Sequence, residues 1–98
     1  MSALERGVEA TARAHLASSD YRIRALSLKL VAHSSQSQDV VAENIKDPDA
    51  RVRMAALESL LTLHNRGVLL KSSLYEIALA TLADEVEEVR FEAIMLIL

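Results

Sequence analysis

The chain has 98 residues, which is enough for one small domain. Hydrophobic residues make up 51% of it but aromatic residues only 3%, so leucine, valine, isoleucine and alanine must build the core. Two glycines and one proline supply too few turn residues for a many-stranded β-protein. The composition therefore predicts an all-α fold.

The net charge of −3 comes from acidic and basic residues that are interspersed along the chain. Binding to nucleic acid or to an anionic membrane normally needs a concentrated basic patch, so we expect neither as the main activity. The chain lacks cysteine, which excludes disulfides and thiolate metal sites. Its first residues include an acid and no long apolar run, so we expect no signal peptide and an intracellular location.

Three helices are predicted in the first half of the chain, because apolar residues recur there at helical spacing. They cover about residues 3–18, 21–33 and 39–46, with short polar breaks between them. A fourth helix follows. Asp47 is expected to cap it, Pro48 to take its first position, and Asn65-Arg66-Gly67 to end it.

Two more helices are predicted after Gly67. Ser73 and Glu76 match a capping box, in which each side chain bonds a backbone amide near the other residue, and this predicts the start of a fifth helix. A sixth helix is expected to begin at Asp84. Its first turn would carry four acids, which the helix dipole favours: Asp84, Glu85, Glu87 and Glu88.

The second, fourth and sixth helices share one pattern. Ile23, Val52 and Val89 hold the same position and are all expected to be buried, and the pattern repeats at intervals of roughly 29 to 37 residues. Each of the three is followed by an arginine, and four residues later by a small side chain. Helix pairs of this length must stack to bury their apolar faces, which predicts an α-solenoid of three helical hairpins over about residues 3–33, 38–66 and 71–98.

The order of acid, valine, arginine and small residue resembles the HEAT-repeat family. The first repeat departs from it with Ser18 and Ser27 in place of acid and alanine. The resemblance implies a right-handed superhelical stack in which acid and arginine bond along the array. The residues that hold these inter-repeat positions here are Asp47, Arg53, Asp84 and Arg90.

The second half of the chain carries a more specific signature. It includes Arg51-Val52-Arg53, then Leu61-x-Leu63-His64-x-Arg66-Gly67, and it resembles the HEAT array of a subunit family of the Integrator complex. That resemblance implies a nuclear, non-catalytic scaffold that holds an RNA endonuclease pair during 3′-end processing of snRNA and nascent transcripts. The alternative is a HEAT-repeat adaptor or regulatory subunit of another complex, in transport or in enzyme regulation.

Residues 93–98 form an apolar run with no cap or polar tail. A terminal repeat normally presents a polar outer face, so we expect the chain to be a fragment of a longer array. The apolar end would then be covered by a further repeat or by a partner.

Catalytic, cofactor and metal sites are not expected. His15, His33 and His64 are far apart, and no His-x-x-x-His pair or glycine-rich phosphate loop exists. The acids near residue 84 lack the glycine-bearing loop that calcium sites use. Three arginines are candidates for a basic strip that faces a partner, although Glu88 interrupts the strip in the third repeat: Arg22, Arg24 and Arg51.

Overall fold

The computed structural model describes residues 2–98 of the chain. It contains six α-helices and one turn of 3-10 helix, with no strand among the described residues, which confirms the all-α prediction. The elements are α1 (Ala3–His15), α2 (Tyr21–Val31), α3 (Gln38–Glu43), η1 (Asn44–Lys46), α4 (Ala50–Asn65), α5 (Ser72–Thr81) and α6 (Glu87–Ile97).

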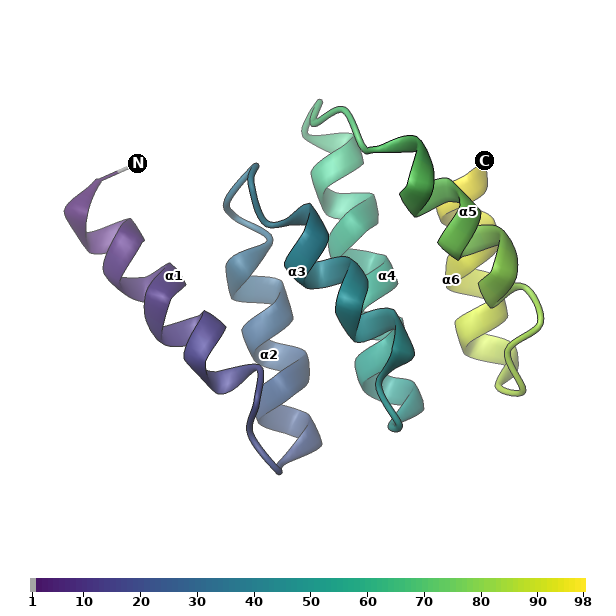
Figure 1. Cartoon of the computed structure of the whole chain (residues 1–98), viewed down its shortest axis with the longest axis horizontal. Coiled ribbons are helices and arrows are strands. Elements are labelled where there is room, and N and C mark those ends of the chain that lie inside the picture. Colours follow the sequence, from purple (N-terminus) through teal and green to yellow (C-terminus); the bar gives the residue numbers. More distant parts are fainter. Residues whose placement is uncertain (1) are drawn as a thin grey trace.

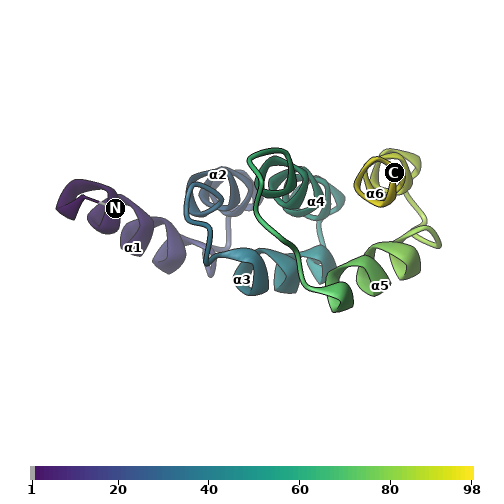
Figure 2. The same cartoon turned by 90° about the horizontal axis from the view of Figure 1, so that it is seen from above.

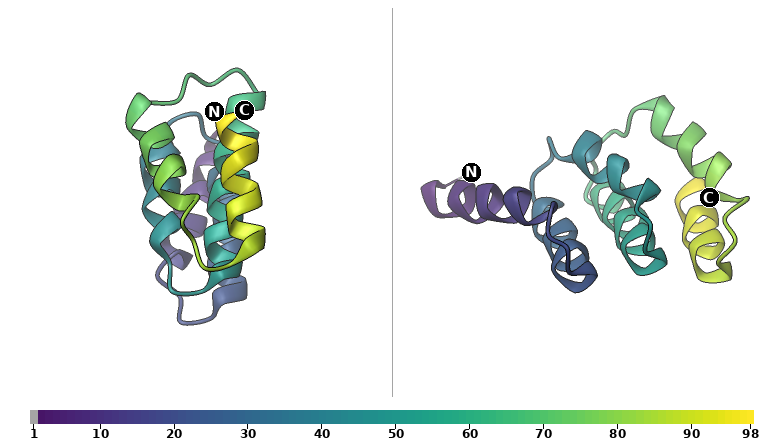
Figure 3. Two further views of the ribbon diagram at one scale, coloured as in Figure 1. Left: turned by 90° about the vertical axis from the view of Figure 1, so that its right-hand side faces the viewer. Right: turned by 60° about the horizontal axis from the view of Figure 1, so that its bottom comes forward.

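The helices lie in two layers. Helices α2, α4 and α6 form one row, and α3 and α5 lie on one side of it (Figures 1 and 2). The Cα atoms span 39 × 31 × 16 Å, and the smallest dimension fits two helix layers whose axes are about 8–10 Å apart. Helix α1 contacts α2, but its axis diverges from those of the row (Figure 3).

Helix α4 forms the centre of the core because it packs against α2, α3 and α6. Its stripe of small and branched side chains is fully buried, among them Val52, Ala56, Leu57 and Leu60. The prediction that Val52 and its equivalents are buried holds for Val52 and Val89. It is wrong for Ile23, which is 38% exposed; α2 stands at the end of the row and has a neighbour in the row, α4, on one side only.

The predicted start of the fourth helix is wrong by two residues. The helix begins at Ala50, its N-cap is Asp49, and Pro48 lies outside it. The Asp49 carboxylate accepts a hydrogen bond from the Arg51 amide at 2.8 Å. Asp47 is not the cap because its carboxylate is occupied by the Asp49 amide and by an arginine of α2.

The capping box predicted for the fifth helix is absent. The helix begins at Ser72, directly after Lys71, and no side chain of the described residues caps it. The sixth helix begins at Glu87 and not at Asp84, so only Glu87 and Glu88 of the four acids lie in its first turn. Asp84 stays in the preceding loop because its carboxylate accepts a hydrogen bond from the Val86 amide, which closes a turn there.

Two of the first three helices are shorter than predicted. Helix α1 ends at His15, where the Ser18 amide turns back to the His15 carbonyl. Helix α2 ends at Val31, and a serine turn follows in which the Ser37 hydroxyl donates to the Ser34 carbonyl at 2.7 Å. The third predicted helix is present, as α3 continued by η1.

Gly67 ends α4 as predicted and has a positive φ of 88°. We expect Gly67→Ala to lower the free energy of unfolding by about 1 kcal/mol, because a side chain is strained in this backbone region. Nothing lies within 4 Å of the added Cβ, so the cost would come from the backbone alone. Chemical denaturation measures it.

Gly7 is the matched control for this test. It lies inside α1 and also has nothing within 4 Å of an added Cβ. Since alanine is the better helix former, Gly7→Ala should raise the free energy of unfolding by about 0.5 kcal/mol. Equal effects of the two substitutions would contradict the assigned backbone conformations.

Candidate protein-interaction site

Helices α2 and α4 are joined by an ion pair near the starts of both helices. Arg24 of α2 donates from Nε and Nη2 to the two carboxylate oxygens of Asp47, at 2.9 and 3.1 Å. Its Nη1 donates to the Ser18 carbonyl at 2.9 Å. Both side chains are largely buried, with 15% and 7% exposed. The guanidinium therefore links its own turn to the turn of the next hairpin.

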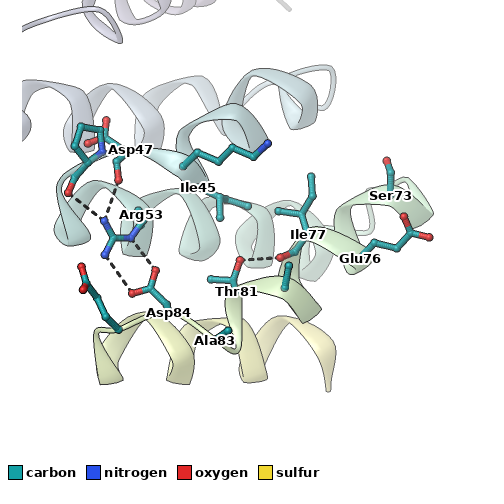
Figure 4. A pocket seen from close by; sticks show the side chains of 13 residues that line it. Ile45, Asp47, Arg53, Ser73, Glu76, Ile77, Thr81, Ala83 and Asp84 are labelled. Atoms are coloured by element: carbon teal, nitrogen blue, oxygen red, sulfur yellow. Dashed lines mark hydrogen bonds and ion pairs between the residues drawn. The ribbon is translucent and has the colours of Figure 1, made fainter.

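Helices α4 and α6 are joined in the same way, by a pair whose two residues lie 31 positions apart in the chain (Figure 4). Arg53 donates to the two carboxylate oxygens of Asp84 at 2.8 and 3.1 Å. Its Nη1 donates to the carbonyls of Asp47 and Pro48 at 3.0 and 3.1 Å. In both pairs Nε and Nη2 of the arginine bond the two carboxylate oxygens of the aspartate. This two-bond contact is stronger than a single hydrogen bond between arginine and carboxylate.

Arg90 of α6 occupies the third equivalent position. Its Nη1 donates to the Asp84 carbonyl at 2.8 Å, as Arg24 and Arg53 do within their own turns. Among residues 2–98, no carboxylate pairs with the rest of its guanidinium. We call Arg24–Asp47, Arg53–Asp84 and Arg90 the arginine ladder.

The turns of the ladder also repeat. The Asp47 carboxylate accepts from the Asp49 amide, and the Asp84 carboxylate accepts from the Val86 amide, both at 2.9 Å. Burial raises the pKa of Asp84, but the bonds from Arg53 and from the Val86 amide outweigh it, so this pKa lies below its usual value. The aspartate is thus held charged for the arginine.

The predicted basic strip is neutralised within the chain. Arg22 pairs with Asp20, and Arg51 pairs with Asp49, each at 2.9 Å within its own helix start. The Arg51 guanidinium also lies 3.5 Å from the centre of the Tyr21 ring and donates to the Tyr21 hydroxyl. A partner's acid would have to compete with these aspartates for Arg22 and Arg51. Arg24, the third arginine of the predicted basic strip, lies in the arginine ladder.

The arginine–aspartate pairs at the helix starts make the stability of the fold sensitive to acid. Hydrogen bonds from the Arg51 side chain and amide lower the pKa of Asp49 to about 2, whereas an unfolded aspartate titrates near about 3.9. This contribution to stability is therefore complete above about pH 4 and is lost as the pH falls toward about 2. We expect the midpoint of thermal unfolding to fall as the pH is lowered from about 4 to about 2. Asp49→Asn still caps the helix but cannot titrate, so the midpoint should fall less steeply in this variant. The same dependence of the midpoint on pH in both proteins would contradict this prediction.

A second link holds the connector between α4 and α5. Arg66 donates to the carbonyls of Ala32 and His33 at the end of α2, both at 3.3 Å. The Gln38 amide oxygen accepts from the Lys71 backbone at 2.9 Å. These contacts were not predicted from the sequence. The Leu-His-x-Arg-Gly motif was the one sequence feature that pointed to Arg66. The bonds of Arg66 to the end of α2 give this arginine a structural role.

The described residues contain no group of three or more histidine or acidic side chains that could hold a metal ion. His15 lies at the end of α1, and His33 and His64 lie near the ends of α2 and α4, all exposed. An open cleft lies between η1 and α5 beside Arg53 and Asp84, lined also by Ile45 and Ile77 (Figure 4). Within residues 2–98, no helix is long and apolar enough to cross a bilayer.

Comparison with known proteins gave one group of relatives. Integrator complex subunit 4 of Mus musculus and of Homo sapiens are each 40% identical to the chain over 60 residues. The Xenopus laevis protein of the same name is 39% identical over 59 residues. The mouse and human matches cover 61% of this chain, which spans only 6% of the length of either relative. No family model matches. The predicted resemblance to an Integrator subunit is thus confirmed.

Proposed function

We propose, from the similarity to Integrator complex subunit 4, that the chain is a non-catalytic scaffold that binds other protein subunits. The single observation that carries the proposal is 40% identity over 60 residues. The repeated ladder supports it, because identical joints between successive hairpins build an extended surface rather than a pocket.

The architecture we infer is a right-handed superhelical stack of HEAT-like hairpins, over about residues 3–33, 38–66 and 71–98. The row of α2, α4 and α6 with α3 and α5 beside it is consistent with such a stack (Figure 2). In this arrangement the structural residues between repeats are Asp47, Arg53, Asp84 and Arg90. Arg24, which pairs with Asp47, belongs to the same set.

The partners that we infer are subunits of a nuclear assembly, foremost an RNA endonuclease pair that acts in 3′-end processing of snRNA and nascent transcripts. Direct binding of nucleic acid is not part of the proposal, because the arginines at the helix starts pair with aspartates of the same chain. Catalysis is not part of it either, since the conspicuous polar residues are engaged in joints between helices.

Capture of the purified endonuclease pair of the Integrator complex tests the proposal. The immobilised wild-type chain is expected to retain the pair, and Ala56→Glu, which should disrupt the core, is expected to lose it. Arg22→Gln should still retain the pair if recognition does not use the basic strip. Failure of the folded wild-type chain to retain the pair would contradict the assignment and favour an adaptor or regulatory role in another complex.

A further inference from the structure

The turn between α2 and α3 contains a sequence pattern that the scaffold function does not use. Residues 34–38 read Ser-Ser-Gln-Ser-Gln, so two of the three serines are followed directly by glutamine. One class of protein serine kinases requires glutamine at the position after the serine that it phosphorylates. So short a motif is informative only where the structure presents it to an enzyme.

The structure distinguishes the three serines of this turn. Ser37 is 0% exposed, and its hydroxyl donates to the Ser34 carbonyl at 2.7 Å. Ser34 is 5% exposed, and its hydroxyl accepts a hydrogen bond from the Gln36 amide at 3.3 Å. Ser35 and Gln36 are both exposed, and within residues 2–98 the Ser35 hydroxyl makes no hydrogen bond. Of the three, Ser35 therefore presents an available hydroxyl together with the glutamine that follows it.

Ser35 lines a cleft in which basic side chains gather. The α2–α3 turn lies at the same end of the row as the end of α4 (Figure 1), and the cleft there is also lined by Arg6, His33 and Arg66. Nη1 of Arg66 donates to the His33 carbonyl, two residues before Ser35, and to the Ala32 carbonyl. Its Nε and Nη2 bond no acceptor among residues 2–98. The guanidinium is thus held beside the turn with two nitrogens available as donors.

A phosphate on Ser35 would be a stronger acceptor for Arg66 than the two carbonyls are. The carbonyls are neutral and lie 3.3 Å from Nη1. A phosphate carries a charge of about −2, and arginine binds it through two charge-assisted hydrogen bonds. Glu5 and Glu9 of α1 line the same cleft and oppose an anion there. Glu9 is already bonded by Arg13 at 2.8 Å, which leaves Glu5 as the opposing charge.

We propose that Ser35 is phosphorylated by a serine kinase that recognises Gln36, and that the phosphate then pairs with Arg66. In the transfer, the Ser35 Oγ forms a bond to the γ-phosphorus of ATP while the bond from that phosphorus to the β–γ bridging oxygen breaks. ADP leaves, and the hydroxyl proton passes to the catalytic base of the kinase. The new ion pair would strengthen the link between the turn after α2 and the end of α4. This inference does not depend on the scaffold function, and the endonuclease capture does not test it.

Phosphorylation of the purified full chain tests the site. The chain is incubated with MgATP and the catalytic domain of a glutamine-directed serine kinase, and the products are mapped by mass spectrometry. We expect one phosphate, on Ser35. Gln36→Glu should lower kcat/KM at least about tenfold, because the kinase pocket loses the side-chain amide that it recognises. Gln38→Glu is the matched control and should be phosphorylated as wild type is, since it keeps an oxygen to accept from the Lys71 amide.

Three results would overturn the proposed site. The folded chain could take up no phosphate, it could take up phosphate on Ser34 or Ser37 instead, or Gln36→Glu could be phosphorylated as fast as wild type. Gln36 is exposed, so its substitution should leave the fold intact, and circular dichroism checks this for each variant.

Phosphorus NMR of the phosphorylated chain tests the pairing with Arg66. The second pKa of a phosphoserine is about 6, and the guanidinium should lower this pKa because it favours the dianion. Arg66→Gln should raise the phosphate pKa back toward about 6, and Arg66→Lys, which keeps the charge but not the fork of N–H groups, should give an intermediate pKa. Glu5→Gln, which removes the opposing charge, should lower the pKa further. The same phosphate pKa in wild type and in Arg66→Gln would overturn the pairing.

Discussion

Replacing Arg53 by alanine should lower the free energy of unfolding by about 3 kcal/mol, measured by chemical denaturation. The side chains of Arg53 and Asp84 are each 12% exposed, so the substitution would leave a largely buried carboxylate without its cation. The carbonyls of Asp47 and Pro48 would lose their donor as well. Because the pair joins α4 to α6, we expect the loss to fall on the packing between these helices.

Arg51→Ala is the matched control, since it removes the same side chain from the same helix two residues earlier. Arg51 is 63% exposed, and within residues 2–98 it pairs only with the aspartate of its own helix start and with Tyr21. Such exposed contacts contribute little, so its cost should stay below about 1 kcal/mol. If both substitutions cost the same, the ladder would not be what joins the hairpins.

Ala56→Glu is expected to be the most damaging single substitution that we consider. Ala56 is 0% exposed inside α4, and a glutamate there would place an unpaired charge between packed helices. A buried charge without a partner costs several kcal/mol, on the order of 4 kcal/mol. A domain of this size has only about 5–15 kcal/mol of stability, so we expect a large loss of helicity and of the cooperative thermal transition in circular dichroism.

Ala10→Glu provides the comparison. Ala10 is exposed in the middle of α1, where a glutamate remains in water and is a good helix former. Its effect should be within about 0.5 kcal/mol of wild type. A similar loss for both variants would mean that the buried face of α4 is assigned wrongly.

The sequence predicted the helices well because their signal is local. The spacing of Val52, Ala56 and Leu60 already defines a helix with one buried stripe, and the structure buries all three. The position of Gly67 likewise defined the end of α4. These features depend on residues within a few turns of one another, and periodicity records them.

The helix starts were predicted less well because distant residues decide them. Asp47 was the better cap by sequence, but Arg24, 23 residues away, binds its carboxylate and leaves Asp49 to cap α4. Asp84 stays outside α6 for a related reason, since Arg53 and the Val86 amide hold it. Exposure of Ile23 depends on which helices pack against α2, at the end of the row, and no local pattern encodes that.

The contacts that tie the helices together link residues only 23 to 34 positions apart along the chain. No long loop has to close before they form, so the entropic barrier to folding should be low and refolding should take milliseconds or less. We expect the helices to form outward from α4, which is the middle helix of the row of α2, α4 and α6. Its amides should exchange with solvent most slowly, and those of α1 fastest.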